Sequence, residues 1–526
     1  MTSVDVKLPS LTSETGRAVS YRLVGNAVAV LMGLAVGVIL ARLLPPVEFG
    51  MFGVAAGIVF VMEIIGSCGM QEALVQRKML SPEDEAAGAL VQMAGAMILG
   101  GGLIVTGPRI EKVFGMPGLG FLVQLQSVVL LMNALGVVPT SRLTRRLAFD
   151  RLAAAEISTR ALGGIVSILL ALRGMGALSL IVGSVTAGAF HTCLVWTFAR
   201  GRIPLVFRVE SVKNLVGYGT GILFSRASIA FARRIDVLII GHRLGPALVG
   251  LYQRGFQLVN IPLFEFANAV SQVLFPAMAS VQDADWRFRR GYLGSVGLSS
   301  MVAFPLLTLL WTTADPLIPL LYGPMWTGTV PILMSLGFVG YLRVVNNPNG
   351  MVAKARGRSV AEATRQAIVL VSTVLFVFLG TSFGIQGAVL GVGMASLLSL
   401  VIMTRLAISI SGVSFFEWLG ALRTTVVSSA VMALAVLGTK AILGSYMPAA
   451  FLLVAASSTG ILVYILSLRM LLTREERQTL EQISRILPAR LSRLFHICIG
   501  LVGPPVPGDA TIPPLLLTEK PNLPKQ

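Results

Sequence analysis

The chain has 526 residues, of which 55% are apolar and 13% are charged, with a mean hydropathy of +0.82. A soluble domain carries about 25% charged residues, so this composition excludes a soluble enzyme, a disordered chain and a secreted disulfide scaffold. The net charge of +18 is spread in short basic clusters between apolar runs, which is typical of topology-setting charges and not of a nucleic-acid-binding surface.

Apolar segments, each long enough to cross a bilayer, follow one another along the chain. They lie near residues 18–41, 50–70, 86–107, 119–140, 153–172, 175–197, 215–240, 250–281, 292–314, 328–345, 366–382, 386–404, 424–442 and 447–471. With the N-terminus inside, the inner gaps hold 18 Lys and Arg residues and the outer gaps hold 6. The positive-inside rule therefore predicts an all-α polytopic membrane protein of about 14 transmembrane helices with both termini cytoplasmic.

The connecting segments are short. Residues 1–17 are polar, which predicts a cytoplasmic N-terminus without a cleavable signal peptide. Ser81-Pro82-Glu83-Asp84 has the pattern of a helix start, with a capping serine and acidic residues in the first turn. Residues 473–526 are basic and then proline-rich, and predict a cytoplasmic tail.

An internal repeat relates the two halves of the chain. At an offset of 200 residues, Pro46 and Gly50 align with Pro246 and Gly250. Two further matches follow at similar spacing, one of Glu156 and Arg160 with Glu362 and Arg365, and one of Gly176-Ala177 with Gly387-Ala388. The repeat predicts two six-helix lobes, 18–212 and 213–410, in pseudo-twofold relation, followed by two extra helices within 411–472.

Several stretches resemble the polysaccharide flippase (Wzx-type) family of the multidrug/oligosaccharidyl-lipid/polysaccharide exporter superfamily. They are ARLLPPVEFGMFGVA, CGMQEALVQRKMLSPED, SRLTRRLAFDRLAAAE, RIDVLIIGHRLGPALVGLYQRGFQL and LFPAMASVQDADWRFRRGY. The similarity extends from about residue 15 to about residue 405, with a departure at Pro45, where the family more often has glycine. The resemblance implies a twelve-helix, two-lobed core with a central cavity, usually followed by two accessory helices. It also implies export of undecaprenyl-pyrophosphate-linked oligosaccharide across the bacterial inner membrane.

Polar and charged residues inside the predicted spans are the candidate substrate-binding groups, because ionisable groups in lipid are costly unless they face a cavity. They are Arg22, Asn26, Arg226, Arg233, Arg234, Arg254 and Arg343. A guanidinium offers a planar fork of donors that matches phosphate oxygens. Alternatives stay open: Arg22 can snorkel to the interface, Arg254 and Arg343 can be interfacial anchors, and Arg233 can pair with Asp236.

Two acidic residues are candidates for coupling transport to an ion gradient. Glu63 lies mid-span among apolar residues, and Asp236 lies near the end of its span. Glu156 with Arg160, and Glu362 with Arg365, have the spacing of internal ion pairs. Glu265 has no assigned role.

Enzyme signals are weak. There is no P-loop, no H-E-x-x-H and no G-x-S-x-G motif, and the Asp283-Ala284-Asp285 sequence lies in a short loop without a nucleotide-binding domain. The three histidines are far apart and the three cysteines have no ligand spacing, so we expect no metal and no cofactor.

The sequence therefore favours a non-enzymatic flippase for lipid-linked oligosaccharide, delivering repeat units for surface polysaccharide or lipopolysaccharide. Its expected partners are the substrate, membrane lipid, and the polysaccharide polymerase and chain-length machinery, without nucleic acid. The alternatives are a cation-coupled multidrug exporter of the same superfamily, a polysaccharide polymerase or ligase, and a scaffold of the assembly machinery.

Overall fold

The computed structural model describes residues 11–77, 80–201, 208, 210, 212, 231, 234–279, 285–357, 359–473 and 476–477. Within some of these helices, namely at 11–24, 26–27, 262–277, 279 and 359–363, only the backbone is described. Every regular element in the described part of the chain is a helix, with no strand, which confirms the all-α prediction.

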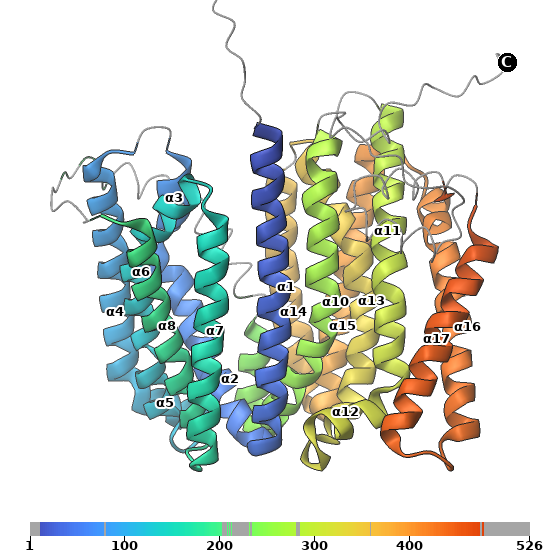
Figure 1. Cartoon of the computed structure of the whole chain (residues 1–526), viewed down its shortest axis with the longest axis horizontal. Coiled ribbons are helices and arrows are strands. Elements are labelled where there is room, and N and C mark those ends of the chain that lie inside the picture. Colours follow the sequence, from blue (N-terminus) through green and yellow to red (C-terminus); the bar gives the residue numbers. More distant parts are fainter. Residues whose placement is uncertain are drawn as a thin grey trace, which may run out of the picture. The chain divides into compact units, whose positions relative to one another are not determined.

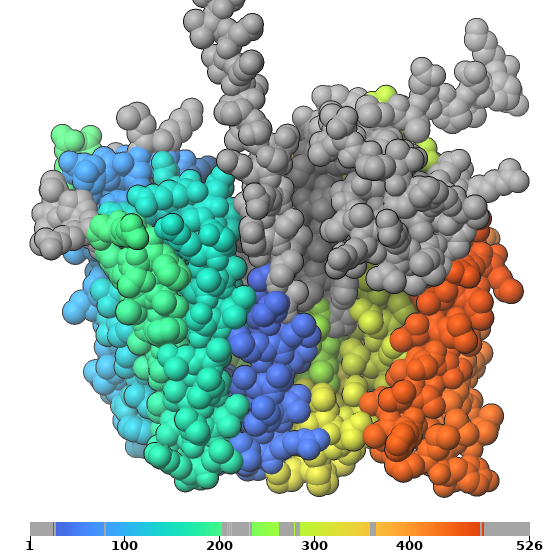
Figure 2. All heavy atoms as spheres, in the orientation of Figure 1, coloured from blue at the N-terminus to red at the C-terminus, as the bar shows by residue number. Residues whose placement is uncertain are grey.

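The chain divides into two compact units, the first made of Met1–Gln253 with Thr373–Ala388. Its helices are α1 (Leu11–Leu43), α2 (Pro46–Ser67), α3 (Met70–Gln76), α4 (Pro82–Phe114), α5 (Leu119–Gln126), α6 (Val128–Arg145), α7 (Phe149–Leu172) and α8 (Ala177–Ala199). α7 packs against α1 on one side and α8 on the other, while α4 packs against α6 (Figure 1). The space-filling view shows α7 and α8 side by side along their lengths (Figure 2). The unit also includes a helical segment at 234–244 and the first turns of α10.

Small residues allow these helices to approach one another closely, as is usual in membranes. A Cβ added at Gly163 of α7 would lie 2.8 Å from the Ala187 Cβ of α8, and one at Gly164 would lie 2.6 Å from a Val36 methyl of α1. The absence of side chains at these two glycines therefore allows α7 to pack closely against both α1 and α8.

The expected helix start at Ser81 is confirmed. The Ser81 hydroxyl accepts a hydrogen bond from the Asp84 N–H, and the Asp84 carboxylate accepts one from the Ser81 N–H, both at 3.2 Å. This reciprocal capping box, with Pro82 at the first position, begins α4.

The second unit is made of Arg254–Ser372 with Val389–Gln526. Its described helices are most of α10 (Pro246–Ala279), α11 (Asp285–Thr312), α12 (Ala314–Tyr322), α13 (Thr329–Ala355), the larger parts of α14 (Ser359–Gly380) and α15 (Gly384–Ser411), α16 (Phe415–Leu443) and α17 (Ala449–Leu471). α16 and α17 pack on each other and on α11. Polar contacts anchor them there: the Tyr464 hydroxyl donates to the Met301 carbonyl and the Lys440 ammonium to the Thr312 carbonyl, both at 2.7 Å.

Ten stretches of the described chain are long and apolar enough to cross a membrane, one of them being the 48-residue run of α14 and α15. The protein is therefore a multi-pass membrane protein. The exact number of fourteen spans, the lobe boundaries and the pseudo-twofold layout stay predictions.

Candidate functional site

The first turns of α2 and α10 cross at the two aligned repeat sequences, within the first unit. A Cβ added at Gly50 would overlap the carbonyl oxygen of Pro246, and a Cβ added at Gly250 would overlap the carbonyl oxygen of Pro46. Each glycine therefore packs directly against the backbone of the other repeat, and the contact is reciprocal. Glycine is required here because any side chain would meet a backbone atom.

Asp236 lies buried next to this crossing, with 3% of its surface exposed. Its Oδ2 accepts a hydrogen bond of 2.6 Å from the hydroxyl of Tyr252 on α10, and its Oδ1 accepts one of 2.8 Å from the Val237 N–H. Tyr252 is itself fully buried. Asp236, predicted as a coupling group, thus joins the segment at 234–244 to α10 through Tyr252, a contact that the sequence analysis did not identify.

Arg234 is half-buried, and its guanidinium carbon lies 5.3 Å from the centroid of the Phe60 ring on α2. This geometry is a cation–π contact. Glu63, one turn further along α2, accepts a hydrogen bond of 2.7 Å from the Asn133 amide of α6. The structure therefore places two predicted site residues on or against the same stretch of α2.

Arg254 and Arg343 lie in the second unit, each over an aromatic ring. Arg254 is 8% exposed, donates a hydrogen bond of 2.8 Å to Gln257 and lies 5.9 Å from the Tyr322 ring centroid. Arg343 lies 5.2 Å from the Phe256 ring centroid, and its Nε is 3.4 Å from the Ser396 hydroxyl. Arg254 is buried and Arg343 is half-buried, and both have polar and aromatic neighbours.

The side chains of the remaining predicted site residues are outside the described part of the structure. Arg226 and Arg233 lie outside the described residues, and so does the predicted pairing of Arg233 with Asp236. Arg22 and Asn26 belong to α1, but their side chains are not among those described. The same holds for the side chains of Glu265 and Glu362, while Asp283 is outside the described chain.

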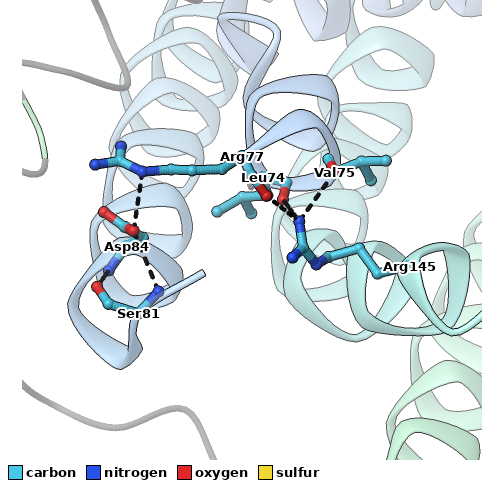
Figure 3. Close-up of polar contacts among 6 residues, drawn as sticks. All are labelled: Leu74, Val75, Arg77, Ser81, Asp84 and Arg145. Carbon is cyan, nitrogen blue, oxygen red and sulfur yellow. Dashed lines mark hydrogen bonds and ion pairs between the residues drawn. The ribbon is translucent and has the colours of Figure 1, made fainter. Parts of the chain in front are cut away.

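A polar cluster around the short helix α3 was not predicted from the sequence. One Arg145 nitrogen, Nη1, donates to the carbonyls of Leu74 at 3.2 Å, Val75 at 3.0 Å and Arg77 at 2.5 Å (Figure 3). The first two carbonyls belong to the last turn of α3 and the third to its capping residue, where helix carbonyls lack partners within the helix. Arg145 therefore ties the end of α6 to the end of α3.

Ion pairs extend this cluster to the start of α4. The Arg77 Nε lies 3.1 Å from the Asp84 carboxylate, which is also the capping group of α4 (Figure 3). Arg142 makes a two-point contact with Glu85, with Nε to Oε1 at 2.7 Å and Nη2 close to Oε2. Arg142 and Arg145, which are among the 18 basic residues counted in the inner gaps, thus have specific partners. The clustering of these arginines in the sequence was the one feature that could have indicated a polar cluster here.

Residues 39–331, more than half of the chain, match the family described as "Polysaccharide biosynthesis protein". The teichuronic acid biosynthesis protein TuaB of Bacillus subtilis (strain 168) is 28% identical over 300 residues, covering 56% of this chain and 62% of TuaB. The succinoglycan biosynthesis transport protein ExoT of Rhizobium meliloti (strain 1021) is 26% identical, covering 56% of this chain and 60% of ExoT. The match thus spans about three fifths of the length of these two relatives.

Solved structures share the fold. The lipid II flippase MurJ, in its inward closed conformation, superposes with a TM-score of 0.70 at 14% identity, covering 85% of this chain and 97% of MurJ. An inward-facing MATE family multidrug transporter of the MOP superfamily superposes with a TM-score of 0.52 at 17% identity, covering 73% of this chain and 96% of the transporter.

The fold is thus that of a class of multi-pass membrane proteins which includes a lipid flippase and a drug transporter. Within that class, the chain belongs to the polysaccharide biosynthesis protein family. This confirms the resemblance drawn from the loop motifs.

Proposed function

We propose that this protein is a flippase for undecaprenyl-pyrophosphate-linked oligosaccharide in the bacterial inner membrane. The observation that carries the proposal is the combination of polysaccharide-family membership with the fold of a flippase for a lipid-linked substrate. Drug export is the alternative that the same fold allows. The charged residues favour the flippase, because a drug cation would call for acidic sites, whereas the candidates are mostly arginines.

Alternating access is the proposed mechanism, and residues 18–212 and 213–410 are the proposed moving lobes. The reciprocal crossing of α2 and α10 supports the internal repeat on which this mechanism is built, since equivalent residues of the two repeats meet there. We assign α16 and α17 as the accessory helices and residues 473–526 as a cytoplasmic tail, with the N-terminus on the same side.

In this proposal, arginines within the spans bind the pyrophosphate. Arg254 and Arg343 are held over aromatic rings, and such cation–π contacts stabilise a charged side chain away from bulk water. Arg226, Arg233, Arg234, Arg22 and Asn26 complete the proposed set. Polymerase and chain-length proteins are proposed to take up the delivered repeat units.

The test is a lipid extract and a surface-polysaccharide assay from cells lacking the gene, complemented by wild-type protein or by the Arg254→Gln and Arg343→Gln variants. We expect loss of surface polymer, accumulation of undecaprenyl-pyrophosphate-oligosaccharide, and restoration by wild-type protein alone. Intact polymer without lipid-linked accumulation, together with new sensitivity to cationic drugs, would move the assignment to a multidrug exporter.

Glu63 is the proposed proton-coupling group, and Glu63→Gln is expected to slow transport at least tenfold and to flatten its pH dependence. The reason is that glutamine mimics a permanently protonated carboxyl while keeping a hydrogen bond to Asn133. Transport in proteoliposomes across a range of pH measures both effects.

Asn133→Leu is the complementary control, because it removes the hydrogen bond that Glu63→Gln keeps and leaves the titrating carboxyl in place. It should therefore retain a pH-dependent step. An unchanged rate and pH profile for Glu63→Gln would remove Glu63 as the coupling group.

A further inference from the structure

Helix α7 has two exposed faces of opposite character. Ile165, Leu169 and Leu172 are 55%, 56% and 64% exposed, as expected for side chains in contact with lipid. The side chains of Glu156 and Arg160 are 46% and 44% exposed. At 3.6 residues per turn, these two charged residues lie roughly 120–180° around the helix from the apolar three.

The charged face continues a buried stripe of the same helix. Gly163, Ser167 and Ala171 are buried, and Ser167 lies two helical turns beyond Arg160 on the same face. A Cβ added at Gly33 of α1 would lie 3.5 Å from the Arg160 Nη1, so Arg160 lies against α1. This face therefore points into the unit, between α1 and α8, and not toward lipid.

The depth of Arg160 along α7 argues against snorkelling. Arg160 is eleven residues from the first residue of α7 and twelve from the last, which is roughly 16–18 Å from either end at 1.5 Å per residue. The hydrocarbon core is about 30 Å thick, so a helix α7 centred in the core carries Arg160 near the middle of the membrane. Half-exposed charges at that depth require water beside them.

The charges around Arg160 are suited to reversible binding of an anion. The Arg160 Nη2 lies 2.7 Å from the Glu156 Oε1, and Glu156 also interacts electrostatically with His191 of α8. Glu156 thus neutralises Arg160 when no ligand is present. Since half of the guanidinium side chain stays exposed, an anionic group can replace or share the carboxylate.

We propose that Glu156 and Arg160 line a hydrated path for the substrate and that Arg160 binds phosphate oxygens of the passing lipid-linked molecule. The proposal rests on the proposed function and extends it to an ion pair whose spacing indicates only an internal structural contact. Glu156 is a positioning residue, which holds the arginine and competes with the ligand for it.

Cysteine labelling tests hydration without requiring transport. In a background with Cys68, Cys193 and Cys498 changed to serine, Glu156→Cys and Arg160→Cys are compared with Ile165→Cys and Leu169→Cys as lipid-facing controls on the same helix. A charged, membrane-impermeant methanethiosulfonate should label the first two at least tenfold faster. Equal, slow labelling at all four positions would overturn the hydrated path.

Ligand binding is tested by protection of the Glu156→Cys protein, which keeps Arg160, in phosphatidylcholine vesicles. Added undecaprenyl diphosphate should slow labelling severalfold, and the slowing should vanish when Arg160→Gln is combined with Glu156→Cys. Equal protection by phosphatidylglycerol would show a site for lipid headgroups in general and would contradict the proposal, as would no protection by either lipid.

Charge reversal separates binding from structure. A Glu156→Arg/Arg160→Glu double variant re-forms the ion pair with the guanidinium one turn away. If the pair only stabilises the helix, this variant should transport normally; if Arg160 binds the substrate, it should stay at least tenfold impaired while expressing normally. Protection by undecaprenyl diphosphate without lipid-linked accumulation in gene-deleted cells would keep this site but reject the flippase assignment.

Discussion

Gly50→Val and Gly250→Val are each expected to abolish transport and to destabilise the protein markedly. The added Cβ of either residue would overlap a backbone carbonyl of the other repeat, Pro246 for Gly50 and Pro46 for Gly250. A backbone atom within a helix cannot rotate away as a side-chain tip can, so the two helices must separate. Overpacking commonly costs about 1–3 kcal/mol, and we expect this case at or above the upper end.

Gly57→Ala on α2 is the matched control, since its added Cβ would lie 3.4 Å from a Leu238 methyl, an ordinary contact with a flexible side chain. Thermal unfolding of the detergent-purified protein and transport in proteoliposomes are the measurements. If Gly50→Val matches Gly57→Ala in both unfolding temperature and transport rate, then Gly50 does not lie in direct contact with the Pro246 carbonyl.

Breaking the Arg142–Glu85 ion pair is expected to lower the free energy of unfolding more than any other single change of charge in the first unit. Their side chains are only 14% and 12% exposed, and Arg142 contacts both carboxylate oxygens. Removing one partner of a fully buried pair commonly costs about 3–5 kcal/mol, because it leaves the other charge uncompensated, and we expect the lower end of this range for a pair that is partly exposed. Arg142→Met should therefore strongly lower expression and the unfolding temperature.

A double-mutant cycle supplies the control for this pair. Arg142→Met combined with Glu85→Leu should recover much of the loss, because no unpaired charge remains. The half-exposed Glu156–Arg160 pair provides a second comparison, since Glu156→Gln should cost no more than about 1 kcal/mol. Additive losses at Arg142 and Glu85 would show that the two side chains act independently.

These expectations differ in how far the sequence supports them. The capping box at Ser81 was predictable, because its signal is contained within four consecutive residues. The family was predictable for a similar reason, since its motifs are continuous stretches. The partners of Asp236, Glu63 and Arg145 were not, because Tyr252, Asn133 and the carbonyls of α3 lie 16 to 71 residues away from them in the chain.

The ion pair of α7 also has one property that the sequence predicted and one that only the structure shows. The spacing of Glu156 and Arg160 predicted their contact, which the structure confirms at 2.7 Å. Periodicity also places them away from Ile165 and Leu169, but it cannot say which face meets lipid. That depends on how α1 and α8 cover the helix, and this packing leaves the pair half exposed.

By itself, the sequence determined that this is an all-helical, multi-pass membrane protein of the polysaccharide biosynthesis family, because hydropathy, charge bias and loop motifs are local properties of the chain. Only the tertiary structure decided that Gly50 and Gly250 each pack against the backbone of the other repeat and that Arg145 binds the end of α3. It also decided that a mid-span ion pair stays exposed. The physical reason is that burial and partner choice arise from helix packing, which brings together residues about 200 positions apart in the chain.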